Sequence, residues 1–98
     1  MSRIVHLPAA DIDIQNAYEY YENLLGGRGV LFLMKLNSAY ETINRFPESG
    51  RIIHGTHRRF LISNFPYAIY YTPYAERIIV AAILDVRQRP EMIRRRLK

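Results

Sequence analysis

The chain has 98 residues and a formal net charge of +5; 49% of its residues are apolar, 23% are charged and none is cysteine. This length supports one domain, residues 1–98, with a single core, and the lack of cysteine excludes a disulfide framework and a thiol nucleophile. No apolar run is long enough to span a membrane, and the first residues lack the apolar segment of a signal peptide, so we expect a cytoplasmic protein.

The first part of the chain predicts a short strand followed by a helix. Residues 3–7 form the strand, with Ile4 and Leu7 as expected core contacts. From Pro8 to Gly26-Gly27, apolar residues recur every three or four positions, which is typical of an amphipathic helix that ends at glycine. The predicted apolar side of this helix consists of Ile14, Ala17, Tyr18, Tyr21, Leu24 and Leu25.

A second helix is predicted from about Gly29 to Phe46, where Pro47 stops it. Its predicted buried stripe consists of Phe32, Leu33, Leu36, Tyr40 and Ile43. Residues 30–34, with the sequence VLFLM, are apolar on every side of the helix, which a solvated helix would not favour. Either the sheet covers this end of the helix on more than one side, or a partner docks there against exposed side chains such as Leu31 and Met34.

The rest of the chain predicts a sheet. Residues 46–50 read as a turn, and two short strands, Arg58–Ser63 and Tyr67–Thr72, are joined through Asn64-Phe65-Pro66. Side chains along the second of these strands should alternate, with Tyr67, Ile69 and Tyr71 on one face and Ala68 and Tyr70 on the other. Every residue from Ile78 to Leu84 is apolar, so we expect this strand to be central and covered on both faces.

The formal charge is concentrated at the C-terminus. Residues 87–98 carry five arginines, one lysine and one glutamate, while the basic and acidic residues of the remaining chain cancel. Arginine favours planar, bidentate contacts with carboxylates and phosphates. The segment is therefore either a solvated, frayed terminus or a surface for an acidic or phosphate-bearing partner.

Three segments of the chain resemble the RelE/ParE superfamily of bacterial toxins. They are Arg58-Arg59-Phe60, Phe65-Pro66-Tyr67-Ala68-Ile69-Tyr70-Tyr71 and Ile83-Leu84-Asp85-Val86-Arg87-Gln88-Arg89-Pro90. With the two-helix opening, the resemblance extends over nearly the whole chain. It implies an α+β fold with an N-terminal strand, an α-helical hairpin, a small twisted sheet of antiparallel strands and a basic C-terminal tail. The superfamily comprises ribosome-dependent mRNA endoribonucleases and DNA gyrase poisons.

The nuclease branch resembles this chain only in part. Arg59 matches a basic residue on its second strand, and Arg87 matches an arginine after its last strand. Its other catalytic positions fall on Leu61, Ala68 and near Ile93, side chains that neither move a proton nor hold a phosphate. Asp85 could serve as a base, but beside Arg87 a carboxylate is expected to form an ion pair with a lowered pKa. Under this alternative the catalytic residues are Arg59, Arg87 and Asp85.

The resemblance is closer to the ParE-like, plasmid-stabilisation branch, whose members trap DNA gyrase on cleaved DNA. Such a protein needs no chemistry of its own, because it acts by stabilising the cleaved state. We therefore expect a type II toxin that is not an enzyme. Asp85 stands where members often carry histidine, so that position is given no role. The expected target-binding residues are Arg58, Arg59, Arg87, Arg89, Arg94, Arg95 and Arg96.

The resemblance also implies a cognate antitoxin with a flexible, acidic and apolar C-terminal segment that folds on the toxin to form a hetero-oligomer. The expected antitoxin-binding residues are Leu31, Met34, Arg94 and Arg95. An inactive member that binds antitoxin without arresting growth is a third alternative. His54 and His57 have a spacing found in metal sites, but the sequence supplies no further ligands beside them, so neither a metal nor another cofactor is expected.

Overall fold

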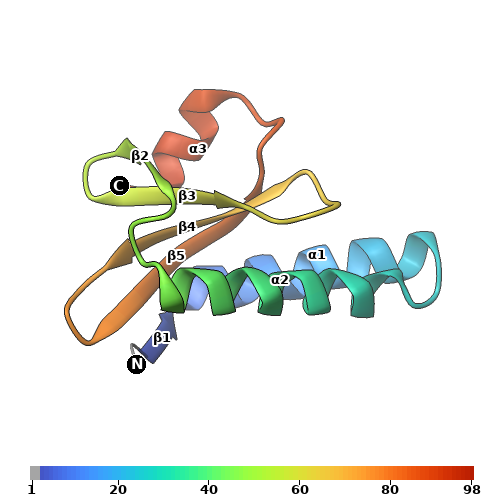
Figure 1. Cartoon of the computed structure of the whole chain (residues 1–98). Coiled ribbons are helices and arrows are strands. Elements are labelled where there is room, and N and C mark those ends of the chain that lie inside the picture. The colour runs from blue at the N-terminus through green and yellow to red at the C-terminus, as the bar shows by residue number, and fades with distance from the viewer. Residues whose placement is uncertain (1–2) are drawn as a thin grey trace.

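A five-stranded sheet forms the centre of the structure, a computed structural model that describes residues 3–98 (Figure 1). In chain order the elements are β1 (Arg3–His6), α1 (Pro8–Leu24), α2 (Arg28–Arg45), β2 (Arg51–His54), β3 (His57–Leu61), β4 (Tyr67–Pro73), β5 (Arg77–Asp85) and α3 (Pro90–Arg96). The strand order is β1-β5-β4-β3-β2; β1 runs parallel to β5 and the other neighbours are antiparallel. The apolar strand β5 is therefore internal, as its composition predicted.

The sheet is covered on both faces. Helices α1 and α2 pack on one face and the short helix α3 on the other (Figure 1). Side chains of β4 alternate between the two cores as predicted: Ile69 and Tyr71 belong to the core under α1 and α2, whereas Ala68 and Tyr70 belong to the core under α3. The N-terminal strand, the helical hairpin and the antiparallel strands confirm the expected α+β class, with a sheet that is mixed because of β1.

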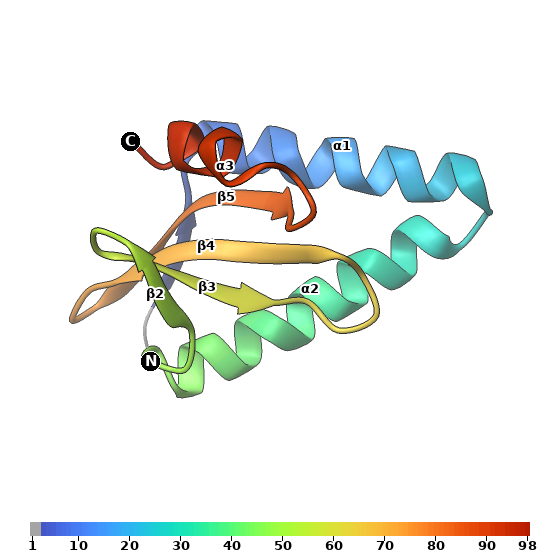
Figure 2. The ribbon, with the colours of Figure 1, turned by 90° about the horizontal axis from the view of Figure 1, so that it is seen from above.

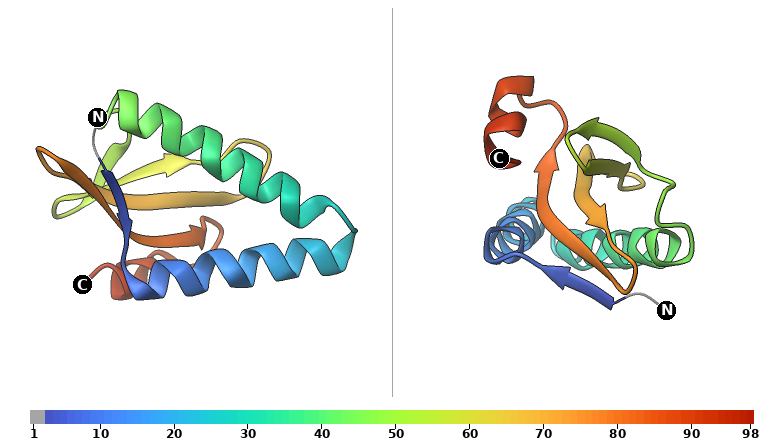
Figure 3. Two further views of the ribbon diagram at one scale, coloured as in Figure 1. Left: turned by 90° about the horizontal axis from the view of Figure 1, so that it is seen from below. Right: turned by 90° about the vertical axis from the view of Figure 1, so that its left-hand side faces the viewer.

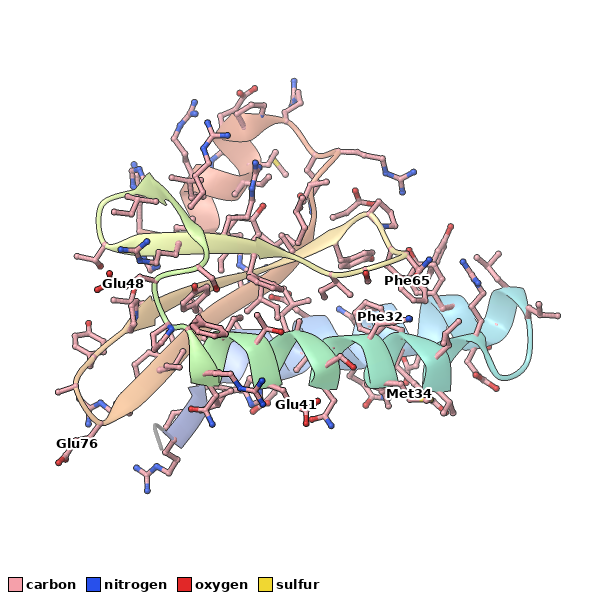
Figure 4. All side chains as sticks on the ribbon, viewed as in Figure 1. Phe32, Met34, Glu41, Glu48, Phe65 and Glu76 are labelled. Carbon is pink, nitrogen blue, oxygen red and sulfur yellow. The ribbon has the colours of Figure 1, made fainter. Side chains whose placement is uncertain are left out.

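The second helix presents a regular stripe to the sheet. Its buried residues Phe32, Leu36, Ala39 and Ile43 recur at three- and four-residue spacing. Figure 4 shows Phe32 pointing toward the sheet and Met34 pointing away from it. Gly29 permits the close approach of α1, because a Cβ atom at this position would lie 2.7 Å from the carbonyl oxygen of Tyr18.

Four apolar side chains that the sequence placed in the core are exposed: Leu7, Leu24, Leu25 and Leu33. Leu7 precedes the first turn of α1 and lies beyond the end of β1. The end of α1 and the start of α2 extend past the sheet (Figure 2), so there is no strand for Leu24 and Leu25 to pack against. Leu33 lies outside the stripe through Phe32 and Leu36 that faces the sheet.

Two elements were missing from the prediction. Strand β2 forms a hairpin with β3 through Gly55, whose φ of 57° suits a glycine. The expected basic tail is a folded helix, α3, which begins at Pro90 and buries Ile93 and Leu97 against the sheet. The C-terminal segment is therefore part of the core rather than a frayed end. Within residues 3–98, the helices are too short or too polar to cross a bilayer.

Candidate functional site

Two arginines lie side by side on the sheet face that also carries α3. Arg51 of β2 is directly opposite Arg59 of β3, and Arg59 is opposite Tyr70 of β4. We call these three residues the arginine row. Like charges that face each other across strands destabilise a sheet, and neither arginine forms an ion pair within residues 3–98. The row is therefore suited to an anionic ligand such as a phosphate.

Tyr70 closes the row beneath α3. Its side chain is buried, and apart from the neighbouring Arg59 guanidinium its hydroxyl group has no hydrogen-bond partner among the described residues. Burial raises the pKa of Tyr70, and the neighbouring Arg59 guanidinium offsets part of this rise. A neutral phenol can donate a proton or a hydrogen bond, but it is a poor base. The row itself thus offers two cations and a donor; the nearby imidazole is that of His57, two residues before Arg59 in β3 and on the same face of the sheet.

The row also shows where sequence reasoning fell short. Arg51 was missed because strand β2 was not predicted, and only the pairing of β2 with β3 brings Arg51 to Arg59. Arg58 and Arg59, which the sequence grouped together, point to opposite faces of the sheet. Arg58 donates hydrogen bonds to the carbonyl oxygens of Glu48 (3.1 Å) and Gly50 (2.8 Å), so it holds the preceding loop in place.

The basic residues of α3 have different surroundings. Arg96 forms a bidentate ion pair with Asp13 of α1, with N–O distances of 3.0 and 2.8 Å. Arg94 and Arg95 are exposed and form no ion pair with the described residues. Arg89 precedes the helix, and its Nε atom lies 3.7 Å from Oε1 of Glu91. Of the predicted C-terminal contacts, Arg94 and Arg95 are thus the ones free to meet a partner.

Asp85 and Arg87 form the ion pair that the sequence predicted. The Arg87 side chain makes two contacts with the carboxylate, at 3.0 and 2.7 Å, and its backbone N–H donates a third hydrogen bond at 2.8 Å. Hydrogen bonds from the Arg87 side chain lower the pKa of Asp85 below its ordinary value, although partial burial opposes them. Asp85 is therefore a weak base.

Of the three residues of the nuclease alternative, Asp85 and Arg87 are in contact, but Arg59 is not brought to them. Asp85 is opposite Tyr67 in the sheet and lines a cleft of about 490 Å³ beside α1, with Tyr20 and Asp13. Arg59 points to the other face, toward α3, through its pairing with Tyr70. Side chains on opposite faces of one sheet cannot act on the same phosphate.

The ion pair predicts a pH effect on Asp85. Because the folded-state pKa lies below the unfolded value, the pair stabilises the fold above pH about 4 and loses this contribution as the pH falls through the folded pKa. We expect the Asp85 carboxyl to titrate below 3.8 in carbon-detected NMR, and nearer that value in an Arg87→Gln variant. Equal midpoints in the two proteins would show that Arg87 does not perturb the carboxyl.

A separate apolar surface lies at the tip of the helical hairpin. We call it the hairpin-tip patch; it consists of the exposed side chains Leu24, Leu25, Val30, Leu33 and Met34. Met34 is exposed as predicted, whereas Leu31 is half-buried and packs against the core. The patch therefore keeps the predicted location at the start of α2, but most of its members differ from those the sequence suggested.

His54 and His57 lie in the β2–β3 hairpin. Within residues 3–98, no group of three or more His, Cys, Asp or Glu side chains is arranged to hold a metal ion. His57 instead approaches the Thr72 hydroxyl at 3.4 Å. The histidines His54 and His57 are thus placed in the β2–β3 hairpin without further ligands around them.

Comparison with known proteins identifies the fold. No family model and no curated protein matches the sequence. Among solved structures, the chain is similar to one described as "Chromosomal ParDE TA system from P. aeruginosa", with a TM-score of 0.73 and 14% sequence identity over 85% of this chain and 94% of that chain. The chain therefore has the ParE-like α+β fold that its sequence resemblance implied.

Proposed function

We propose that this chain is the toxin of a type II toxin–antitoxin pair, and that it inhibits DNA gyrase by stabilising the enzyme's cleaved-DNA complex. The observation that carries the proposal is the likeness in fold to a chain of a ParDE toxin–antitoxin system, which extends over 94% of that chain. Arg94 and Arg95 on α3 and the arginine row would face gyrase or its DNA. The inhibitor would act through binding alone, because a ligand that prefers the cleaved state shifts the equilibrium toward it.

The geometry of the carboxylates supports binding over catalysis. Asp85 is held by Arg87, and Asp13 is held by Arg96, so neither is placed to accept a proton from a nucleic-acid hydroxyl. The arginine row supplies cations and a phenol but no carboxylate, and the His57 imidazole on the same sheet face is engaged with the Thr72 hydroxyl at 3.4 Å. The second candidate, a ribosome-dependent mRNA endoribonuclease, is favoured by the row itself, because Arg51 and Arg59 would hold a phosphate.

The cognate antitoxin would cover the hairpin-tip patch. Five exposed apolar side chains at one end of a small protein are a suitable dock for an amphipathic segment. Acidic residues in the same segment would reach Arg94 and Arg95, which have no ion-pair partner within residues 3–98. Toxin and antitoxin would then form a hetero-oligomer.

Incubation of the purified chain with gyrase, ATP and supercoiled plasmid tests the proposal. After detergent and protease treatment we expect linear DNA in proportion to the chain's concentration, and no linear DNA when the antitoxin encoded beside it is added first. An Arg94→Glu/Arg95→Glu variant should give less linear product. The substitutions reverse the charge of both exposed side chains that would contact gyrase or its DNA. Lys35→Glu, a charge reversal on α2, is the matched control and should act as the parent chain does.

Two outcomes would reject the gyrase proposal. One is a folded, antitoxin-free preparation that yields neither linear DNA nor loss of supercoiling. The other is cleavage of mRNA on ribosomes that is lost in Arg51→Ala or Arg59→Ala, which would establish the nuclease instead. Growth of cells expressing the chain at the normal rate, with neither activity, would support an inactive antitoxin-binding protein.

A further inference from the structure

A cleft of about 590 Å³ lies where two distant turns meet. We call it the end cleft; its lining consists of Arg45, Phe46, Pro47, Glu48, Ser49, Pro73, Tyr74 and Ala75. Arg45 ends α2, and the next four residues lead toward β2; Pro73 ends β4, and Tyr74 and Ala75 lead to β5. Figure 3 shows this β4–β5 turn at the end of the molecule opposite the hairpin tip. The end cleft is therefore separate from the hairpin-tip patch.

The α2–β2 wall of the end cleft is held in a defined shape. The Tyr71 hydroxyl donates a hydrogen bond to the carbonyl oxygen of Pro47 (2.8 Å) and accepts one from the backbone N–H of Gly50 (2.9 Å). Arg58 donates two more hydrogen bonds to carbonyl oxygens of the same loop. Gly50 packs so closely that a Cβ atom would lie 2.5 Å from the Tyr71 hydroxyl. The wall is thus preorganised, which lowers the entropic cost of binding.

Two aromatic side chains in the end cleft are left in solvent. Phe46 is 59% exposed and Tyr74 is 54% exposed, although they come from turns far apart in the sequence. The Arg77 guanidinium lies 5.8 Å from the centre of the Tyr74 ring. On its other side Tyr74 borders a second cleft of about 540 Å³, together with Arg3 and Arg77. Flat aromatic faces beside arginines provide stacking surfaces for nucleobases.

Three guanidinium groups belong to residues that line the end cleft or the second cleft beside Tyr74. These residues are Arg3, Arg45 and Arg77, and none of them forms an ion pair with the described residues. Arg3 and Arg77 are paired in the parallel register of β1 and β5, so two like charges lie next to each other. Glu48 and Glu76 also lie at this end of the molecule (Figure 4). The cations outnumber the carboxylates, and an anion between Arg3 and Arg77 would relieve their repulsion.

We propose that the end cleft binds single-stranded nucleic acid. A base stacks on Tyr74 or Phe46, and the adjoining phosphates contact Arg77, Arg3 or Arg45. Stacking on aromatic rings combined with arginine contacts to the backbone is the general means by which proteins hold single strands without reading their sequence. This inference goes beyond the proposed function and does not depend on gyrase.

Fluorescence anisotropy of the full chain with fluorescein-labelled (dT)10 at low salt tests this inference. We expect saturable binding that weakens as salt is added, because phosphate contacts release counterions. A Phe46→Ala/Tyr74→Ala variant should bind at least about tenfold more weakly, since each base loses an aromatic stacking surface. Far-UV circular dichroism and thermal melting should match the parent chain, because both side chains are exposed.

The matched control is Ile12→Ala/Tyr20→Ala, which removes an exposed aliphatic and an exposed aromatic side chain from α1 and should bind (dT)10 as the parent does. The proposal is overturned if the parent shows no saturable binding, or if the aromatic variant binds normally while Arg94→Glu/Arg95→Glu does not. It is also overturned if decaproline, rather than (dT)10, binds in the parent and is lost in the aromatic variant. The gyrase assay does not depend on (dT)10 binding. Failure of the end-cleft proposal can therefore be distinguished from failure of the gyrase proposal.

Discussion

Replacing Asp13 by alanine is expected to lower the free energy of unfolding by roughly 3 kcal/mol. The Asp13 side chain is only 10% exposed and accepts three hydrogen bonds, one from the backbone N–H of Ile83 (3.0 Å) and two from Arg96. These contacts join α1, β5 and α3 at one point. Removal of the carboxylate leaves a backbone donor and a guanidinium without their partner.

Urea denaturation of matched variants would measure this effect. Asp13→Asn keeps an oxygen for the Ile83 N–H, so it should lose less stability than Asp13→Ala. Asp11→Ala is the control, because Asp11 is in the same helix but its side chain is 66% exposed, and we expect a change within about 0.5 kcal/mol. Equal losses in Asp13→Ala and Asp11→Ala would mean that the contact with Arg96 and Ile83 contributes nothing to folding.

Tyr71→Phe is expected to destabilise the chain by roughly 2 kcal/mol although it removes a single oxygen atom. The Tyr71 side chain is buried, and its hydroxyl bonds both the N–H of Gly50 and the carbonyl oxygen of Pro47. The variant leaves both backbone groups without this partner. Because they belong to the wall of the end cleft, the loss should be localised there.

Hydrogen exchange distinguishes this result from a general loss of stability. The Gly50 amide should exchange faster in Tyr71→Phe by more than the change in global stability accounts for, since its own acceptor is gone. Tyr74→Phe removes the same oxygen from an exposed side chain and should leave both the unfolding midpoint and the Gly50 amide unchanged. Unchanged protection at Gly50 in Tyr71→Phe would contradict the assigned hydrogen bonds.

The elements with strong local signals were predicted from the sequence. The spacing of Phe32, Leu36 and Ile43 identified α2, and the alternation along β4 assigned its two faces. The apolar run of β5 identified an internal strand. Helix α3 was missed because seven residues carry too few turns for a periodic pattern, and its arginines hid the buried positions Ile93 and Leu97.

The candidate sites depended on contacts between distant segments much more than the helices and strands did. The sequence grouped Arg58 with Arg59 because they are neighbours, but strand geometry sends them to opposite faces. Arg51 joins Arg59 only through the β2–β3 hairpin, and Phe46 meets Tyr74 only where two turns converge. Arg96, whose contact with a partner stays a prediction, is bound to Asp13, which lies 83 residues earlier in the chain.

The sequence by itself determined the α+β class, the helical hairpin, the internal strand and the Asp85–Arg87 ion pair. Each of these follows from interactions between residues close together in the chain, where periodicity and spacing are informative. The tertiary structure alone decided which arginines are free, which apolar side chains stay in solvent and which turns form the end cleft. Those properties arise from strand register and the packing of distant segments, which no local pattern encodes.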